Sequence, residues 1–156
     1  MLQSRNIETT TLRAIYDYWH SKCRQNRLPL RADLNPADIP RLLPYIYIVD
    51  VERDPLRFRF RLVGTRVCDW FGHDATGRYV DDPLQGDLDP GMTEIYRQVV
   101  ESRVPRHVHR DIPELGSLVH SFDRLVLPLA GQDGAVEKLI CGLWVRPWQE
   151  QRAIAT

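Results

Sequence analysis

The residues whose types and spacing best fit a metal-binding or catalytic role are His107 and His109. Two histidines at positions i and i+2 of a β-strand point to the same face of the sheet, and imidazole nitrogens are common metal ligands. His120 or Asp111 would supply a third ligand. A His-x-His pair is a short motif, however, and it lacks the acidic and glycine-rich context of a metal-binding barrel. We therefore predict no metal site, and a small metal-dependent enzyme using the His107/His109 pair is the alternative function.

Other catalytic patterns are missing from the sequence. Ser102, Ser117 and Ser121 lack the Gly-x-Ser-x-Gly setting of a hydrolase nucleophile, and no phosphate-binding glycine loop occurs. We therefore predict that the protein is not an enzyme. A haem needs only one axial histidine, so the sequence identifies no cofactor, and the cofactor stays unknown.

Charge and hydropathy restrict the possible partners. The chain has 156 residues, with 21 basic and 21 acidic side chains, whereas nucleic-acid-binding proteins usually carry a clear basic excess. No apolar run approaches the roughly 20 residues that cross a bilayer, and the polar residues 1–5 do not begin a secretory signal. We predict a cytoplasmic protein that binds no nucleic acid and does not insert into membranes.

An amphipathic helix is expected near the start of the chain, over residues 9–25. Leu12, Ile15, Tyr16 and Trp19 recur at steps of three and four, which is the spacing of one apolar face of a helix. A short helix gains little stability alone, and an exposed apolar stripe is unusual on a monomer. We therefore predict a homodimer whose interface includes these four residues. The same helix is also the piece of chain available to cover a second sheet face.

The rest of the chain predicts an α+β fold. Asn35 and Pro36 are typical of a helix start, and Pro44 ends that helix. Strands are expected over residues 45–51, 56–63, 104–112, 118–129 and 135–145. Besides residues 36–44, helices are expected over residues 65–71 and 92–100. Hairpins at the two ends with helices between them favour an antiparallel sheet with helices over one face.

Several motifs resemble those of a bacterial PAS-domain family that was first catalogued as a domain of unknown function. They are YDYW at residues 16–19, DLNPADIPRLLP at 33–44, FRFRLVGT at 58–65, FG at 71–72, TGR at 76–78 and FDRLVLPL at 122–129. The resemblance implies a five-stranded antiparallel sheet with helices on one face, in which Gly64, Gly72 and Gly77 serve turns. It also implies a stand-alone sensory or signalling module that acts on a protein partner in trans, through its own dimer, or both.

The predicted domain organisation follows the same resemblance. Residues 1–32 form an N-terminal helix and linker, residues 33–148 form the PAS-like sensor domain, and residues 149–156 form a C-terminal tail.

A cavity between the central helices and the sheet is the predicted ligand site. Its apolar wall would consist of Trp70, Phe71, Tyr79, Ile95, Val99 and Phe122. Polar groups for orienting a ligand would come from His107, His109 or Arg124, depending on a strand register that the sequence does not fix. Ligand sites are commonly apolar with a few such groups. The alternative is a ligand-free structural adaptor in which these side chains only fill the core.

Overall fold

The computed structural model describes residues 2–83, 91–112 and 119–147, which form three helices and five strands. The helices are α1 (Thr10–Ser21), α2 (Thr65–Phe71) and α3 (Met92–Ser102). The strands are β1 (Ile46–Glu52), β2 (Arg57–Val63), β3 (Arg106–Asp111), β4 (Val119–Ala130) and β5 (Val136–Pro147). All strand pairs are antiparallel, in the order β2-β1-β5-β4-β3. The predicted α+β fold with a five-stranded antiparallel sheet and a leading helix is therefore confirmed.

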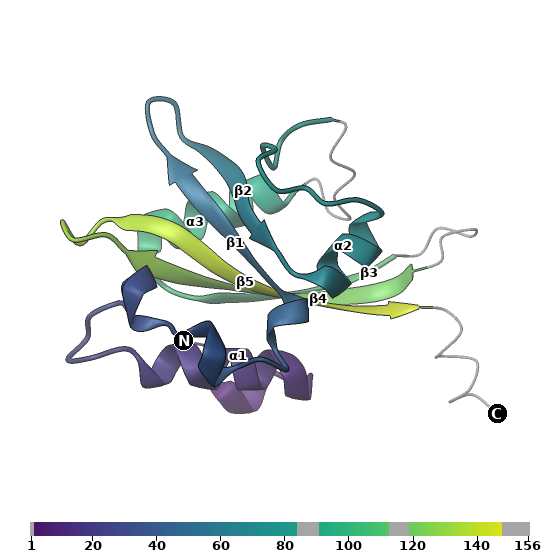
Figure 1. Cartoon of the computed structure of the whole chain (residues 1–156), viewed down its shortest axis with the longest axis horizontal. Coiled ribbons are helices and arrows are strands. Elements are labelled where there is room, and N and C mark those ends of the chain that lie inside the picture. The colour runs from purple at the N-terminus through teal and green to yellow at the C-terminus, as the bar shows by residue number, and fades with distance from the viewer. Residues whose placement is uncertain (1, 84–90, 113–118, 148–156) are drawn as a thin grey trace.

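The two faces of the sheet are covered by different parts of the chain (Figure 1). Helices α2 and α3 pack on one face, which we call the helix face, where Val67, Phe71 and Tyr96 join a buried cluster. Helix α1 and the segment that follows it pack on the other face, which we call the α1 face. Because side chains alternate along a strand, the central strands β1, β4 and β5 contribute to both clusters.

Helix α1 buries its apolar stripe on the chain's own sheet. Leu12, Ile15, Tyr16 and Trp19 are at most 7% exposed, and Trp19 Nε1 donates a hydrogen bond of 2.9 Å to the Pro128 carbonyl of β4. A dimer interface at these four residues therefore stays a prediction, and its premise of an exposed stripe is not met. The stripe is not an exposed surface, because the sheet already covers it.

The segment between α1 and β1 contains short 3-10 helices where a single helix over residues 36–44 was expected. Three of them are η2 (Arg31–Asp33), η3 (Pro36–Asp38) and η4 (Leu43–Tyr45); a fourth, η1 (Ser4–Asn6), precedes α1. Asn35 does cap η3, since its side chain accepts a hydrogen bond from the Ala37 amide. The helix stops at Ile39, which has φ −134°, because a residue before proline is disfavoured in the helical region.

The remaining expected elements lie close to their predicted places. Helix α2 ends at Phe71, and the next residue, Gly72, has a φ of 84°, the left-handed conformation expected after a helix. Helix α3 begins at Met92, where the helix expected over residues 92–100 also begins. No helix within the described ranges is long and apolar enough to cross a membrane.

Candidate functional site

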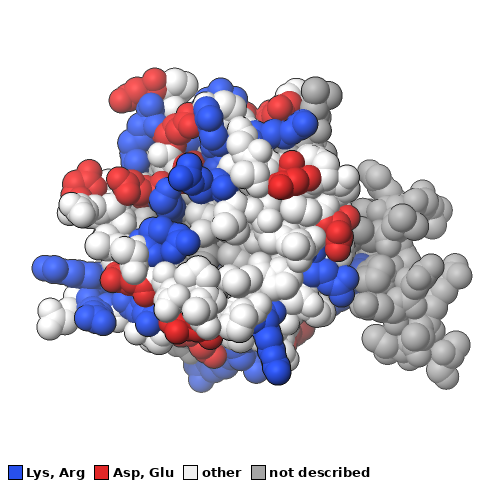
Figure 2. Space-filling view, viewed as in Figure 1, with Lys and Arg blue, Asp and Glu red and all other residues white. Residues whose placement is uncertain are grey.

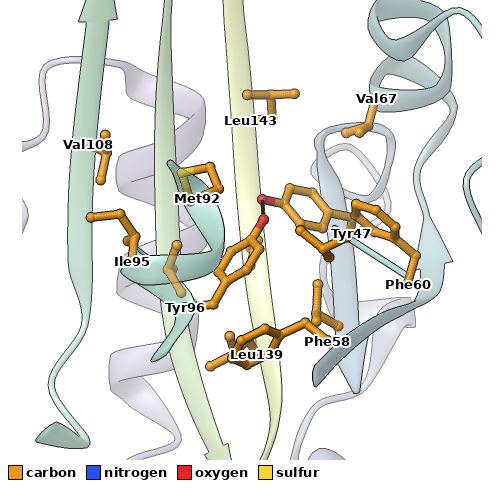
Figure 3. Packing of buried hydrophobic residues seen from close by; sticks show 14 of the residues in the cluster. Tyr47, Phe58, Phe60, Val67, Met92, Ile95, Tyr96, Val108, Leu139 and Leu143 are labelled. Carbon is orange, nitrogen blue, oxygen red and sulfur yellow. Dashed lines mark hydrogen bonds between the residues drawn. The ribbon is translucent and has the colours of Figure 1, made fainter. Parts of the chain in front are cut away.

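A buried arginine lies on the helix face of the sheet. Arg124 of β4 is fully buried and heads the series of large side chains with no solvent exposure. Its Nη1 donates hydrogen bonds to Tyr47 Oη at 2.8 Å and to Tyr96 Oη at 3.2 Å. The two hydroxyl oxygens lie 2.6 Å apart and share a hydrogen bond. Figure 3 shows how Tyr47, from β1, and Tyr96, from α3, point their hydroxyls toward each other. We call these three residues the Arg124 cluster.

Apolar side chains surround the Arg124 cluster. The guanidinium carbon lies 5.3 Å from the centre of the Phe122 ring and 5.7 Å from that of Tyr47. Met92 and Leu139 are further members of the same buried group. Cations near aromatic faces are attracted electrostatically, and more strongly when water is excluded. The result is a small set of hydrogen-bond donors held at fixed positions inside an apolar core.

The structure brings four of the predicted pocket residues into this core. Phe71, Ile95, Val99 and Phe122 all belong to the buried cluster of the helix face. Trp70 lies half-buried at its margin, where its ring centre is 6.0 Å from that of Tyr45.

Tyr79 lies elsewhere, at the edge strand β2. The guanidinium carbon of Arg57 is 3.4 Å from its ring centre and that of Arg59 is 4.5 Å away. Its hydroxyl donates to Glu52 Oε1 at 2.8 Å. The ring therefore belongs to a partly exposed polar cluster.

The two predicted histidines lie on the α1 face, opposite the Arg124 cluster. Val108 of β3 is buried against the helices, so its neighbours His107 and His109 point to the other side of the sheet. Of the three polar residues that the sequence offered for the pocket, only Arg124 faces the central helices.

The α1 face has a polar cluster of its own around the buried carboxylate of Asp123. This carboxylate accepts hydrogen bonds from His109 Nδ1 at 2.6 Å and from Thr9 Oγ1 at 3.1 Å. Arg146 Nη1 lies 2.5 Å from Asp123 Oδ2, and His107 Nε2 is 3.7 Å from Oδ1. Thr9 is the N-cap residue of α1, so this Asp123 cluster ties the start of that helix to β3, β4 and β5.

The surroundings of the Asp123 cluster shift the pKa values of its members in different directions. Burial raises the pKa of Asp123, but hydrogen bonds from His109 and Arg146 outweigh this and lower it overall. The hydrogen bond to Asp123 raises the pKa of His109, and a second one to Asp111 adds to this effect. Burial lowers the pKa of His107 despite the nearby Asp123 charge.

These opposite shifts predict opposite effects of pH on stability. A raised histidine pKa stabilises the fold below the unfolded value of about 6.5, and that stability is lost as pH rises through the folded value. For His107, with a lowered pKa, stability is lost as pH falls below about 6.5. We expect urea unfolding between about pH 5.5 and about pH 8.5 to show two different effects. His109→Gln should remove the loss of stability at high pH, and His107→Gln should remove the loss of stability at low pH. Identical profiles for both variants would contradict this assignment.

The metal-site alternative gains no support from this geometry. Both ring nitrogens of His109 contact carboxylates, Nδ1 that of Asp123 and Nε2 that of Asp111 at 3.0 Å. Across residues 2–83, 91–112 and 119–147, no group of three or more histidine, cysteine or acidic side chains has the arrangement of a metal site.

Tyr47 and Tyr96 were absent from the predicted pocket, and Arg124 was predicted there only as one of three alternative polar groups. A signal for Arg124 does exist in the sequence, because it follows Phe122 by two positions on one strand and must share its face. Tyr96 follows Ile95 on the apolar stripe of α3. Tyr47 sits in an apolar strand without alternation, so no pattern distinguishes its face.

An antiparallel sheet in this strand order, with α2 and α3 over one face, defines an α+β domain of the PAS class. Comparison at the family level agrees, since the PAS domain family matches residues 7–144. The chain belongs to the PAS domain family. The match includes the leading helix α1.

Solved structures share this fold at low sequence identity. The PAS domain of BvgS from Bordetella pertussis is 21% identical, with a TM-score of 0.54 over 76% of this chain and 88% of that one. A Light-Oxygen-Voltage domain studied with a flavin analogue is 17% identical, with a TM-score of 0.51 over 76% and 89% of the two chains. An RNA-binding Light-Oxygen-Voltage receptor is 14% identical, with a TM-score of 0.51 over 84% of this chain and 37% of that one. Comparison with curated proteins gives no match.

Proposed function

We propose that the chain is a sensory signalling module that binds a small molecule with an acidic group at the Arg124 cluster. The observation that carries the proposal is the complete burial of Arg124 together with two tyrosine hydroxyls in an apolar core. Placing a guanidinium in such a core is costly, and its planar set of donors matches the geometry of a carboxylate. We infer that this matched geometry lets the cluster recognise the acidic group of a ligand.

The position of the cluster also supports a route from ligand to output. Arg124 and Asp123 are neighbours on β4 and point to opposite faces of the sheet. A shift of β4 at the ligand would therefore reach Thr9 at the start of α1 through Asp123. We propose that α1 and the Asp123 cluster are the part of the module that responds.

The remaining functional expectations are part of the same proposal. The module acts by binding and not as an enzyme, in the cytoplasm, and it signals to a protein partner in trans or through a homodimer. Light scattering on the full chain tests the dimer, since the burial of the α1 stripe leaves open which other surface would form it.

Binding of an acidic ligand should depend on the charge of Arg124. Native mass spectrometry of freshly purified protein should show a retained small acid. The melting temperature should rise when benzoate or succinate is added, but not when benzamide is added. Arg124→Met keeps the approximate volume and removes the charge, so the affinity for these acids should fall about 10- to 100-fold, as expected for a lost charge-assisted hydrogen bond.

Two further variants make this experiment decisive. Tyr96→Phe removes one hydroxyl and keeps the ring, so it should weaken acid binding less than Arg124→Met and leave the fold intact. Arg41→Gln removes an exposed arginine of the segment between α1 and β1 and should leave benzoate binding unchanged. A wild type that retains no ligand and responds to no acid would show that the Arg124 cluster is structural only.

A further inference from the structure

A cavity of about 370 Å³ lies on the α1 face of the sheet, away from the Arg124 cluster. Its floor consists of Ile46 and Ile48 of β1 and Ile140 of β5, and its opposite wall is the segment between α1 and β1, with Leu34, Ile39 and Leu43. In Figure 2, uncharged surface extends across the middle of the molecule, with most of the charged side chains above and below it. A volume of this size falls within the range of small-molecule sites.

The chemistry of the cavity wall is almost entirely apolar. Of the described side chains around it, only Arg31 is charged. Arg31 Nη1 donates to the Leu34 carbonyl at 3.2 Å, and a guanidinium carries five N–H donors, so this one bond uses a small part of its donor capacity. Leu62 at the other side of the cavity is 44% exposed although it is apolar.

We propose that this cavity binds a small amphipathic carboxylate, such as a medium-chain fatty acid. The alkyl chain would lie on the isoleucine floor, where burying apolar surface is favourable, and the carboxylate would pair with Arg31, the only charge on the wall. Charge complementarity thus selects an acid over an amine, and the apolar wall selects an alkyl chain over a polar metabolite. The site is independent of the ligand proposed for the Arg124 cluster.

The structure of η2 helps to hold Arg31 in position. Asp33 Oδ2 accepts a hydrogen bond of 2.8 Å from the Leu30 amide, which closes the turn from which Arg31 projects. Leu34, at the end of this turn, is only 7% exposed and packs in the α1-face cluster. An arginine on an anchored turn loses less conformational freedom when it binds a carboxylate than one on a free segment does.

Isothermal titration of the full chain with octanoate and with octan-1-ol tests the proposal. Both compounds carry the same number of carbon atoms, so both should bind, and octanoate should bind more tightly. Arg31→Gln should weaken octanoate binding about 10-fold, as expected for a charge-assisted hydrogen bond, and leave octan-1-ol within about twofold. Leu62→Trp adds bulk at an exposed position of the cavity and should weaken both.

Matched variants separate this site from the other candidates. Arg41→Gln removes an exposed arginine of the same segment that does not line the cavity, and octanoate binding should be unchanged. Octanoate binding that is lost in Arg124→Met and kept in Arg31→Gln would place the acid on the helix face and overturn the inference. Absence of binding by both compounds would overturn it too. A dimer that Leu62→Glu dissociates would assign the cavity to a second copy of the chain instead.

Discussion

Replacing Gly64 by alanine is expected to destabilise the protein by about 3 kcal/mol or more, because overpacking against fixed backbone exceeds the usual range for extra methyl groups. A Cβ at this position would lie 2.3 Å from the Leu43 oxygen, 2.5 Å from the Pro44 oxygen and 2.7 Å from the Ile46 oxygen. All three are backbone atoms. They cannot move aside without displacing η4 and the start of β1, which form the wall and floor of the α1-face cavity.

Gly72→Ala is the matched control for this experiment. Gly72 has a φ of +84° and nothing within 4 Å of an added Cβ, so alanine there should cost only the roughly 1–2 kcal/mol of a left-handed residue. Urea unfolding of both variants measures the difference. Equal free energies of unfolding for the two variants would show that the backbone around Gly64 can shift to accommodate the added Cβ at little cost.

The roles of the turn glycines show what a sequence pattern can and cannot supply. Gly72 follows an apolar helical stripe, and its left-handed conformation is the one that this position predicts. Gly64 was expected at a turn as well, but its φ of −64° is open to any residue. Its requirement for glycine comes from three carbonyls contributed by a different segment of the chain, and no local pattern reveals such a contact.

The period of the apolar residues predicts those helices and strands that bury one face and expose the other. The stripes of α1 and α3 and the Arg-Phe alternation of β2 give a clear contrast between buried and exposed positions, so these elements could be predicted. By contrast, the predicted helix over residues 36–44 is divided into 3-10 helices, because the residue before Pro40 leaves the helical region. The cap signal at Asn35 was correct, and the helix length was not.

The candidate site was less predictable because β4 is buried on both faces. Asp123 and Arg124 are both almost fully buried, so hydropathy along the strand does not say which of them faces the helices. The pairing of Arg124 with Val108 of β3, which is buried against the helices, settles the register. Once that register is known, His107 and His109 belong with Asp123, and the polar group on the helix face is Arg124.

The partner of the α1 stripe is a second property that periodicity leaves open. An amphipathic helix has the same sequence pattern whether it packs on its own sheet or on a second copy of the chain. The space for α1 is provided by Gly142 of β5, where an added Cβ would lie 2.7 Å from Leu12 Cδ2 and 3.0 Å from Ile15 Cδ1. The side chains of α1 therefore pack closely against β5 of the same chain.

Trp19→Ala is therefore expected to lower the free energy of unfolding by about 3–5 kcal/mol, the usual cost of truncating a buried large aromatic side chain. Trp19 is 4% exposed, its ring centre lies 5.9 Å from that of Tyr16, and its Nε1 donates to the Pro128 carbonyl. Trp19→Phe keeps most of the packing and loses this hydrogen bond, so it should cost roughly 1 kcal/mol from the bond itself plus a smaller packing loss.

Urea unfolding at two protein concentrations distinguishes the two ways of burying this residue. If α1 packs on its own sheet, the losses in Trp19→Ala and Trp19→Phe are the same at both concentrations, because Trp19 is buried within each chain. If the stripe instead formed the interface of an obligate dimer, the midpoint of the wild type would rise with concentration, and Trp19→Ala would reduce that dependence. The first result is expected, since Trp19 is already buried within a single chain by β4 and by Tyr16.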